Sequence, residues 1–272
     1  MGGYMIADVS TIVARGMGIR RGGRWILRPA VFGITGGVIG FAGPRGAGKT
    51  CLLSTFATLR RPHVGALEIL GHDTGNPAGL RAARALLGYL PGDFAWAADL
   101  RVGDFVAYAG YYKRVPAGAV EAALDRFELR DVASMSLSML PADMRLRAGL
   151  AATCVHRPRL VLLDEPFAAI DGGTGDRTED RAGDKTGEKA VDKAMELWPV
   201  IRSLAPTVLV TASAADRLVG RCDRIFTLAR GRLTEPAVET GPSHRSAPRP
   251  APPVRSRRAP GRTRPQRIGA GV

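Results

Sequence analysis

The sequence of 272 residues has few cysteines and no long apolar run. Its three cysteines, Cys51, Cys154 and Cys222, show no metal-ligand spacing, so we expect reduced thiols in or near the core. No apolar run approaches the roughly 18 residues of a membrane-spanning helix, and the opening MGGYMIADVS lacks the regions of a signal peptide. We therefore expect a cytosolic protein whose contact with a membrane comes through a partner.

The net charge of +14 is concentrated near the end of the sequence. From Gly241 to Val272 there are eight arginines and no acid, so this stretch holds +8 of the charge, together with seven prolines and almost nothing apolar. This composition predicts a disordered tail at 236–272, which either binds anionic lipid or nucleic acid nonspecifically or serves only solubility. The rest of the chain is only mildly basic, so charge does not predict a nucleic-acid-binding protein.

The stretch GPRGAGKT, at 43–50, matches the phosphate-loop pattern G-x-x-x-x-G-K-[ST]. It lies between GVIGFA, which predicts a buried strand, and an amphipathic stretch with Leu52, Leu53, Phe56 and Leu59 on one helical stripe. Glycines let successive backbone N–H groups face phosphate oxygens at the start of that helix. The residues expected to bind nucleotide here are Gly43, Pro44, Arg45, Gly46, Ala47, Gly48, Lys49, Thr50 and Cys51.

Two residues of the loop have separate roles in this prediction. Lys49 supplies a full positive charge to the phosphates. Thr50 offers a hydroxyl oxygen to Mg²⁺, which bridges and neutralises the β- and γ-phosphates.

A second acidic site follows the apolar run LVLL at 160–163, which predicts another buried strand. Asp164 and Glu165 come directly after it, at the carboxyl end where ligands bind in open parallel sheets. We expect Asp164 to hold the Mg²⁺ shell and Glu165 to polarise an attacking water. Acids at a strand end are a weak signal alone and a strong one together with a phosphate loop.

The order of the predicted elements is that of an α/β protein. The expected fold is a P-loop NTPase core, a mostly parallel sheet flanked by helices, with a small antiparallel sheet in the first 35 residues. Helical periodicity predicts an inserted helical subdomain at about 92–152, and a repeating acid-base pattern predicts a flexible charged insertion at about 172–190. A helix is predicted to begin at about Ala190, and Pro199 is expected to interrupt or kink it.

By these motifs the chain resembles the ATP-binding subunits of ABC transporters, of the drug-exporter and ABC-2 type, over roughly residues 10–235. The resemblance implies two cassettes that enclose Mg·ATP between them and couple its hydrolysis to a membrane permease, at the cytoplasmic face. The resemblance also matches Asp171, in FAAID, to the aspartate of the D-loop, which follows the acidic strand end and belongs to the nucleotide site of the family. Kinases and GTPases are the other P-loop candidates, and neither class explains a helical insertion before the sequence DEP.

Several positions depart from the family pattern. The aromatic residue that stacks on adenine is replaced by Arg21, with Trp25 nearby, and a second hydroxyl after Thr50 is replaced by Cys51. The metal-contacting glutamine is replaced by Gly92. The switch histidine is replaced by Ser213, which is expected to hydrogen-bond a phosphate or water at the nucleotide site but cannot carry a positive charge.

The segment that corresponds to the family's signature motif, at the start of a predicted helix, departs from the pattern as well. It reads Leu140, Pro141, Ala142 and Asp143, in which a proline removes an N–H group and an acid repels phosphate. The same residues are good helix-start residues with no ligand at all, which is the interpretation we favour.

Three functions agree with this pattern. The chain is a working transporter ATPase, a degenerate cassette that binds Mg·ATP and turns it over slowly or only with a partner, or an ATP-binding regulatory module without transport. The retained Lys49, Thr50, Asp164 and Glu165 favour nucleotide binding, and the transporter subunit with weakened hydrolysis is the prediction.

Overall fold

The structure, a computed structural model, describes residues 10–116, 118–170 and 195–235. The predicted charged insertion at 172–190 and the predicted basic tail at 236–272 lie outside these ranges. Within the described ranges, no helix is both long enough and apolar enough to cross a membrane.

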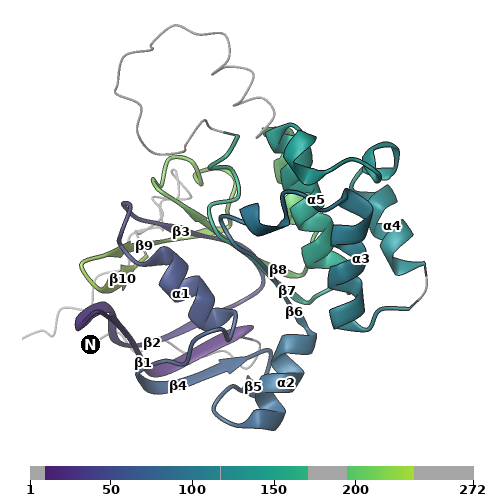
Figure 1. Cartoon of the computed structure of the whole chain (residues 1–272). Helices are drawn as coiled ribbons and strands as arrows, with labels where there is room; N and C mark the ends of the chain where they lie inside the picture. Colours follow the sequence, from purple (N-terminus) through teal and green to yellow (C-terminus); the bar gives the residue numbers. More distant parts are fainter. Residues whose placement is uncertain (1–9, 117, 171–194, 236–272) are drawn as a thin grey trace, which may run out of the picture. The chain divides into compact units, whose positions relative to one another are not determined.

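The first described strands form an antiparallel sheet (Figure 1). β1 (Ile12–Arg21) and β2 (Arg24–Ile34) pair as a hairpin whose two turn glycines both have positive φ, as the tightest hairpin turns require. β4 (Val64–Ile69) pairs with the other edge of β1, and β5 (His72–Asp73) follows it. The predicted N-terminal antiparallel sheet is therefore confirmed, and strands from beyond the phosphate loop complete it.

A second sheet of six strands forms the centre of the protein. Its strands, in spatial order, are β10 (Arg232–Thr234), β9 (Arg224–Ala229), β3 (Gly37–Ala42), β8 (Thr207–Ala212), β7 (Leu160–Leu163) and β6 (Leu87–Leu90). All neighbouring pairs are parallel except β10 with β9. The predicted mostly parallel sheet is confirmed, and the carboxyl ends of its parallel strands meet at one edge.

The residues of β7 show why this sheet is buried on both faces. Val161 and Leu163 belong to one hydrophobic cluster, and Leu160 and Leu162 belong to another. Successive side chains of a strand point to opposite faces, so a fully apolar strand needs a cover on each side.

One face of the parallel sheet is covered by α1 (Lys49–Phe56) and the antiparallel sheet (Figure 1). The Phe56 ring contacts those of Phe32 and Phe41, with centroids 6.3 and 6.1 Å away. The expectation that Leu59 continues this buried stripe is wrong, since Leu59 is 64% exposed. The helix ends at Phe56 and Thr58 has a φ of 60°, which turns the chain away from the helical path.

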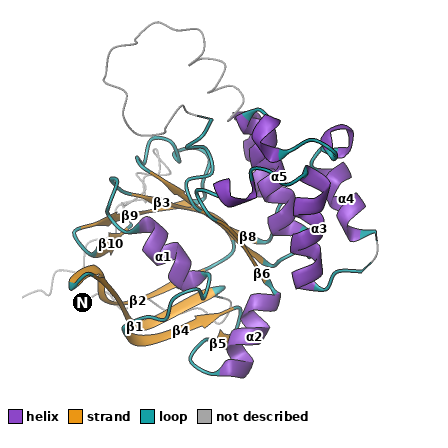
Figure 2. Ribbon diagram, in the orientation of Figure 1, coloured by secondary structure: helices purple, strands orange, loops and turns teal. Residues whose placement is uncertain are grey.

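The other face is covered by a group of helices that lie together in Figure 2. They are α3 (Val102–Lys113), α4 (Ala119–Arg126) and α5 (Ala142–Cys154), with the 3₁₀ helices η1 (Ala95–Ala97), η2 (Arg130–Val132) and η3 (Leu137–Met139). Phe105, Phe127 and Leu150 from this group share a cluster with the sheet. α2 (Pro77–Ala85) stands apart, begun by the Asn76 side chain, which accepts a hydrogen bond from the Gly79 N–H. The predicted helical insertion is present, and its subdomain boundaries remain a prediction.

Residues 195–202 are helical through Pro199, so the expectation that Pro199 interrupts this helix is wrong, and the alternative of a kink stays a prediction. Leu197, Trp198 and Ile201 are buried in the same cluster as the helical group. A proline inside a helix costs about 3 kcal/mol, whereas burying one large apolar side chain contributes about 1.5–3 kcal/mol. Three such side chains therefore outweigh one proline.

Candidate functional site

The loop between β3 and α1 holds a shape that only glycine allows at two positions. A Cβ atom on Gly43 would lie 2.5 Å from the Leu228 carbonyl oxygen. Gly48 has a φ of 101°, and a Cβ atom there would lie 2.2 Å from Ile26 Cγ2. These close approaches set the loop at the carboxyl edge of the parallel sheet, where its N–H groups and the start of α1 create an anion site.

Lys49 is 4% exposed and lies inside this loop. Its Nζ donates to the carbonyl oxygens of Gly43 at 2.6 Å and Pro44 at 3.2 Å. The third partner is Glu165, whose Oε1 lies 3.0 Å from Nζ. The ammonium group is therefore aimed from the loop at the end of β7, the strand predicted to carry the acids.

Asp164 is buried at the end of β7, with 3% exposed. Its Oδ1 accepts a hydrogen bond from the Thr211 hydroxyl at 2.9 Å, and the Thr50 hydroxyl also favours its charged form. Burial raises the pKa of Asp164, and the two hydroxyl groups and Lys49 work against this rise. A buried carboxylate with a raised pKa gains from a cation placed beside it.

Glu165, the next residue, has a φ of 46°, a conformation unfavourable for a side chain with a Cβ atom. Its backbone N–H donates to the Thr211 hydroxyl at 2.7 Å. The Thr211 oxygen thus accepts from Glu165 and donates to Asp164, and this bond pair holds the strained turn. Such strain is concentrated at functional sites.

Thr211 was not among the predicted site residues. The signal for it lies in the parallel register: Val210 on β8 pairs with Leu163 on β7, which places Thr211 opposite Asp164. A polar residue there, directly after the apolar residues Val208–Val210 of the strand, marks the residue that hydrogen-bonds the acid.

A cavity of about 450 Å³ lies between the phosphate loop and the end of β7. It is lined by Arg21, Ile26, Arg45, Gly46, Gly48, Lys49, Thr50, Cys51, Gly92, Asp164, Glu165 and Ala168. The structure thus brings together most of the predicted nucleotide and metal ligands. Gly43, Pro44 and Ala47 belong to the loop but do not line this cavity. Within the loop, the Pro44 carbonyl oxygen accepts a hydrogen bond from the Ala47 N–H at 3.1 Å.

Three departures from the family pattern lie around this cavity. Arg21 Nη1 is 3.6 Å from the Cys51 sulfur, so both replaced positions lie together in the wall. Gly92 lies against Asp164, where a Cβ atom would be 3.0 Å from the Asp164 carbonyl oxygen. Trp25, expected near the base, does not line the cavity. Ile26 does, and neighbours in a strand point to opposite faces, so Trp25 packs instead under the Arg20 guanidinium, 4.0 Å from the ring centre.

The remaining predicted residues lie elsewhere. Ser213, just beyond β8, lines a second cavity that is described below. Asp171 is outside the described residues. Pro141 directly precedes α5, and Asp143 is in the first turn, as expected for a helix start.

The donor set fits Mg²⁺. A threonine hydroxyl and a carboxylate are the hard oxygen ligands that Mg²⁺ takes, and nucleotide phosphates commonly complete its shell. The described part of the chain has no group of three or more His, Cys, Asp or Glu residues placed to hold a metal ion. Thr50 and Asp164 are the residues that would hold it, at the junction of loop and strand.

This geometry defines the chain as a P-loop nucleotide-binding protein of the α/β class. Residues 34–168 match the family described as "ABC transporter". Residues 34–168 therefore form a domain of this family, and the resemblance seen in the motifs is confirmed.

Two relatives and one solved structure show the extent of the similarity. The chain is 32% identical over 205 residues to "Daunorubicin resistance ATP-binding protein DrrA3" of Streptomyces coeruleorubidus, covering 73% of this chain and 58% of that protein. It is 29% identical over 205 residues to "Probable multidrug ABC transporter ATP-binding protein YbhF" of Escherichia coli strain K12, covering 73% of this chain and 32% of that protein. The chain thus spans little more than half of one relative and a third of the other.

The solved structure of cbiO1 from Clostridium perfringens, part of the ABC transporter complex cbiONQ, superposes with a TM-score of 0.67. It covers 84% of this chain and 88% of that one at 19% identity. At this identity the similarity concerns the fold, which confirms the predicted P-loop α/β architecture.

Proposed function

We propose that this chain is the ATP-binding subunit of an ABC transporter, which binds Mg·ATP at the phosphate loop and hydrolyses it slowly or only with a partner. The observation that carries the proposal is the convergence of Lys49 and Thr50 with Asp164 and Glu165 around one cavity. These residues come from two segments more than a hundred positions apart.

Each residue has a chemical task in this proposal. Lys49 exchanges its bond to Glu165 for a phosphate, because a phosphate carries more negative charge than a carboxylate. Thr50 and Asp164 would hold a magnesium ion, which would supply charge neutralisation at the phosphates. Glu165, released from Lys49, is then able to orient and polarise a water molecule.

Slow turnover follows from the departures. Ser213 carries no positive charge, Gly92 has no side chain to contact the metal, and Pro141 and Asp143 weaken the helix start as a phosphate site. Loss of one preorganised group commonly lowers the rate by about 10²–10³-fold, although such losses do not simply add.

A groove of about 430 Å³ supports the proposal that the chain has a protein partner. It is lined by Phe94, Trp96, Phe105, Tyr108 and Tyr112, and Trp96 and Tyr112 are each 67% exposed. Exposed aromatic side chains in such number mark an interaction site. We propose that a membrane permease docks here at the cytoplasmic face, and that a second cassette, of the same or another chain, packs over the phosphate loop.

The departures also support a second candidate, an ATP-binding regulatory module without transport. The two candidates differ in their partner. If the chain is a transporter subunit, the full chain should co-purify with a multi-spanning membrane protein, and Tyr108→Ala with Tyr112→Ala should lose it. Val219→Ala, which changes an apolar side chain 62% exposed elsewhere, is the matched control.

Nucleotide binding is tested by titration calorimetry of the full chain with Mg·ATP. We expect binding by the native protein and a loss of about tenfold or more in Lys49→Ala, since hydrogen bonds to charged groups are the strong ones. Phosphate release measured on the same preparation should be slow. Rapid turnover by the isolated chain would contradict weakened hydrolysis, and the absence of any ATP binding would contradict the proposed function.

A further inference from the structure

The cavity at the phosphate loop has two sides that differ in their side chains. On one, the acid side, Asp164 and Glu165 follow β7. On the other, the hairpin side, Arg21 of β1 and Ile26 of β2 line the cavity from the antiparallel sheet. Because magnesium and the outer phosphates would bind on the acid side, the nucleoside of a bound nucleotide would lie toward the hairpin side.

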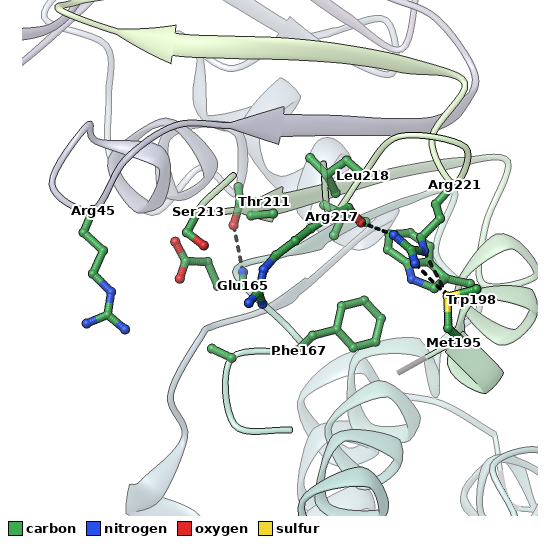
Figure 3. Close-up of a pocket in the computed structure, with 13 residues that line it drawn as sticks. Arg45, Glu165, Phe167, Met195, Trp198, Thr211, Ser213, Arg217, Leu218 and Arg221 are labelled. Carbon is green, nitrogen blue, oxygen red and sulfur yellow. Dashed lines mark hydrogen bonds between the residues drawn. The ribbon is translucent and has the colours of Figure 1, made fainter. Parts of the chain in front are cut away.

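The acid side adjoins a second cavity, of about 270 Å³ (Figure 3). Arg45 and Glu165 line both cavities, and the second one extends to Ser213. Its lining includes two aromatic residues, Phe167 and Trp198, whose ring centroids lie 5.2 Å apart. These rings therefore lie on the side of the terminal phosphates and not on that of the nucleoside.

The hairpin side offers no aromatic ring on which a base could stack. Among the described residues, none of the side chains that line the first cavity is aromatic. Trp25 pairs with Arg20 across the hairpin, and a Cβ atom on Gly18 would lie 2.8 Å from Trp25 Cζ3, so the Trp25 ring packs on the face that carries those two residues. A protein selects a base by aromatic stacking and by matched hydrogen bonds, so this side is poorly suited to select one.

Arg21 is directed at the start of α1 instead. Its Nη1 lies 3.6 Å from the sulfur of Cys51, the third residue of that helix. The first turn of a helix has backbone N–H groups without partners inside the helix, and these attract anions. A sulfur is a weak acceptor, so a phosphate oxygen would be a stronger partner for the Arg21 guanidinium. Lys49 and magnesium would hold the outer phosphates, which leaves the α-phosphate for Arg21.

We propose that the site binds nucleoside triphosphates with little selectivity for the base, and that Arg21 contacts the α-phosphate. The inference rests on the proposed function, since it needs a nucleotide in the phosphate loop. It widens the ligand from ATP to a chemical class, because the affinity comes from a phosphate chain that all nucleoside triphosphates share.

The test compares four ligands in excess Mg²⁺ by titration calorimetry of the full chain. They are ATP, GTP, CTP and inorganic tripolyphosphate, which has the phosphate chain without a nucleoside. We expect the three nucleotides to bind with dissociation constants within about threefold of one another. Arg21→Ala should weaken all four ligands by the same factor, about three- to tenfold, since Arg21 is exposed and its charge is partly screened. Arg21→Lys keeps the charge without the paired N–H groups and should fall between the two.

Arg20→Ala is the matched control. It removes an exposed arginine from the neighbouring position of the same strand, so it lowers the net charge equally, and Arg20 does not line the cavity. It should leave all four affinities unchanged, and circular dichroism should show that every variant is folded.

The outcomes separate the two proposals. A difference of more than about threefold among the three nucleotides would refute the weak base selectivity. If Arg21→Ala weakens the nucleotides but not tripolyphosphate, Arg21 contacts the nucleoside, and if it weakens none of them, Arg21 has no role. Each of these results would overturn the inference and leave the proposed function standing. If the native chain binds none of the four ligands, and Lys49→Ala behaves identically, both proposals fail together.

Discussion

Replacing Thr211 by valine keeps the branched shape of the side chain and removes the hydroxyl that joins β8 to the turn after β7. That hydroxyl accepts from the Glu165 N–H at 2.7 Å and donates to Asp164 Oδ1 at 2.9 Å, and Thr211 is 1% exposed. A buried N–H left without a partner costs about 1–3 kcal/mol, and a lost hydrogen bond to a charged group about 1.5–3 kcal/mol. The added methyl group returns about 0.8 kcal/mol. We expect the free energy of unfolding to fall by about 2–4 kcal/mol.

Denaturant unfolding followed by circular dichroism at about pH 7 measures this change. Thr211→Ser is the control, because it keeps the hydroxyl and loses one methyl group, which costs about 1 kcal/mol. The deficit of Thr211→Val should shrink in acid, below the folded-state pKa of Asp164, because the protonated carboxyl no longer attracts the hydroxyl proton as strongly. A valine variant as stable as the serine variant would refute the bridging role of Thr211.

Four further changes test the site and the core. Gly48→Ala forces a Cβ atom to 2.2 Å from Ile26 Cγ2 at a φ of 101°, so we expect a loss of about 2 kcal/mol or more in unfolding free energy, and a variant as stable as the native protein would contradict the steric argument. Asp164→Asn removes a buried charge whose pKa burial raises, so at neutral pH the ligand-free protein should melt at a higher temperature while losing its response to Mg²⁺. Glu165→Gln should retain ATP binding and lose the remaining phosphate release, which a colorimetric phosphate assay follows. Burial lowers the pKa of His156 to about 4, so the free energy of unfolding should fall as pH drops from about 6.5 toward 4. In His156→Gln, the melting temperature should depend less on pH over the same range.

The local elements of the cassette could be predicted because their signals are local. The β3 strand, the phosphate loop and α1 follow from an apolar run, a glycine pattern and a helical stripe that adjoin one another. The same holds for β7, whose predicted bounds match the observed Leu160–Leu163. The errors arose where the signal was not local. Leu59 fits the stripe of α1, but the helix ends before it, and the helix at 195–202 continues through Pro199 because tertiary packing outweighs propensity.

Contacts across the sheet could not be predicted in this way. Trp25 and Ile26 are neighbours in sequence, and only the pairing of β1 with β2 decides which of them lines the cavity. Thr211 lies about fifty residues after Asp164 in the sequence, and no pattern in either segment predicts the hydrogen bond between them.

The sequence by itself determined which residues are the candidates for the proposed chemistry, because glycines at set spacing, a lysine, a threonine and two acids after an apolar run form patterns that each lie within one local segment. Only the tertiary structure decided which side chains surround that chemistry. The register of parallel strands β3, β7 and β8 brings Thr211 to Asp164. That register results from the burial of two apolar faces at once, a condition that no single segment of the chain contains.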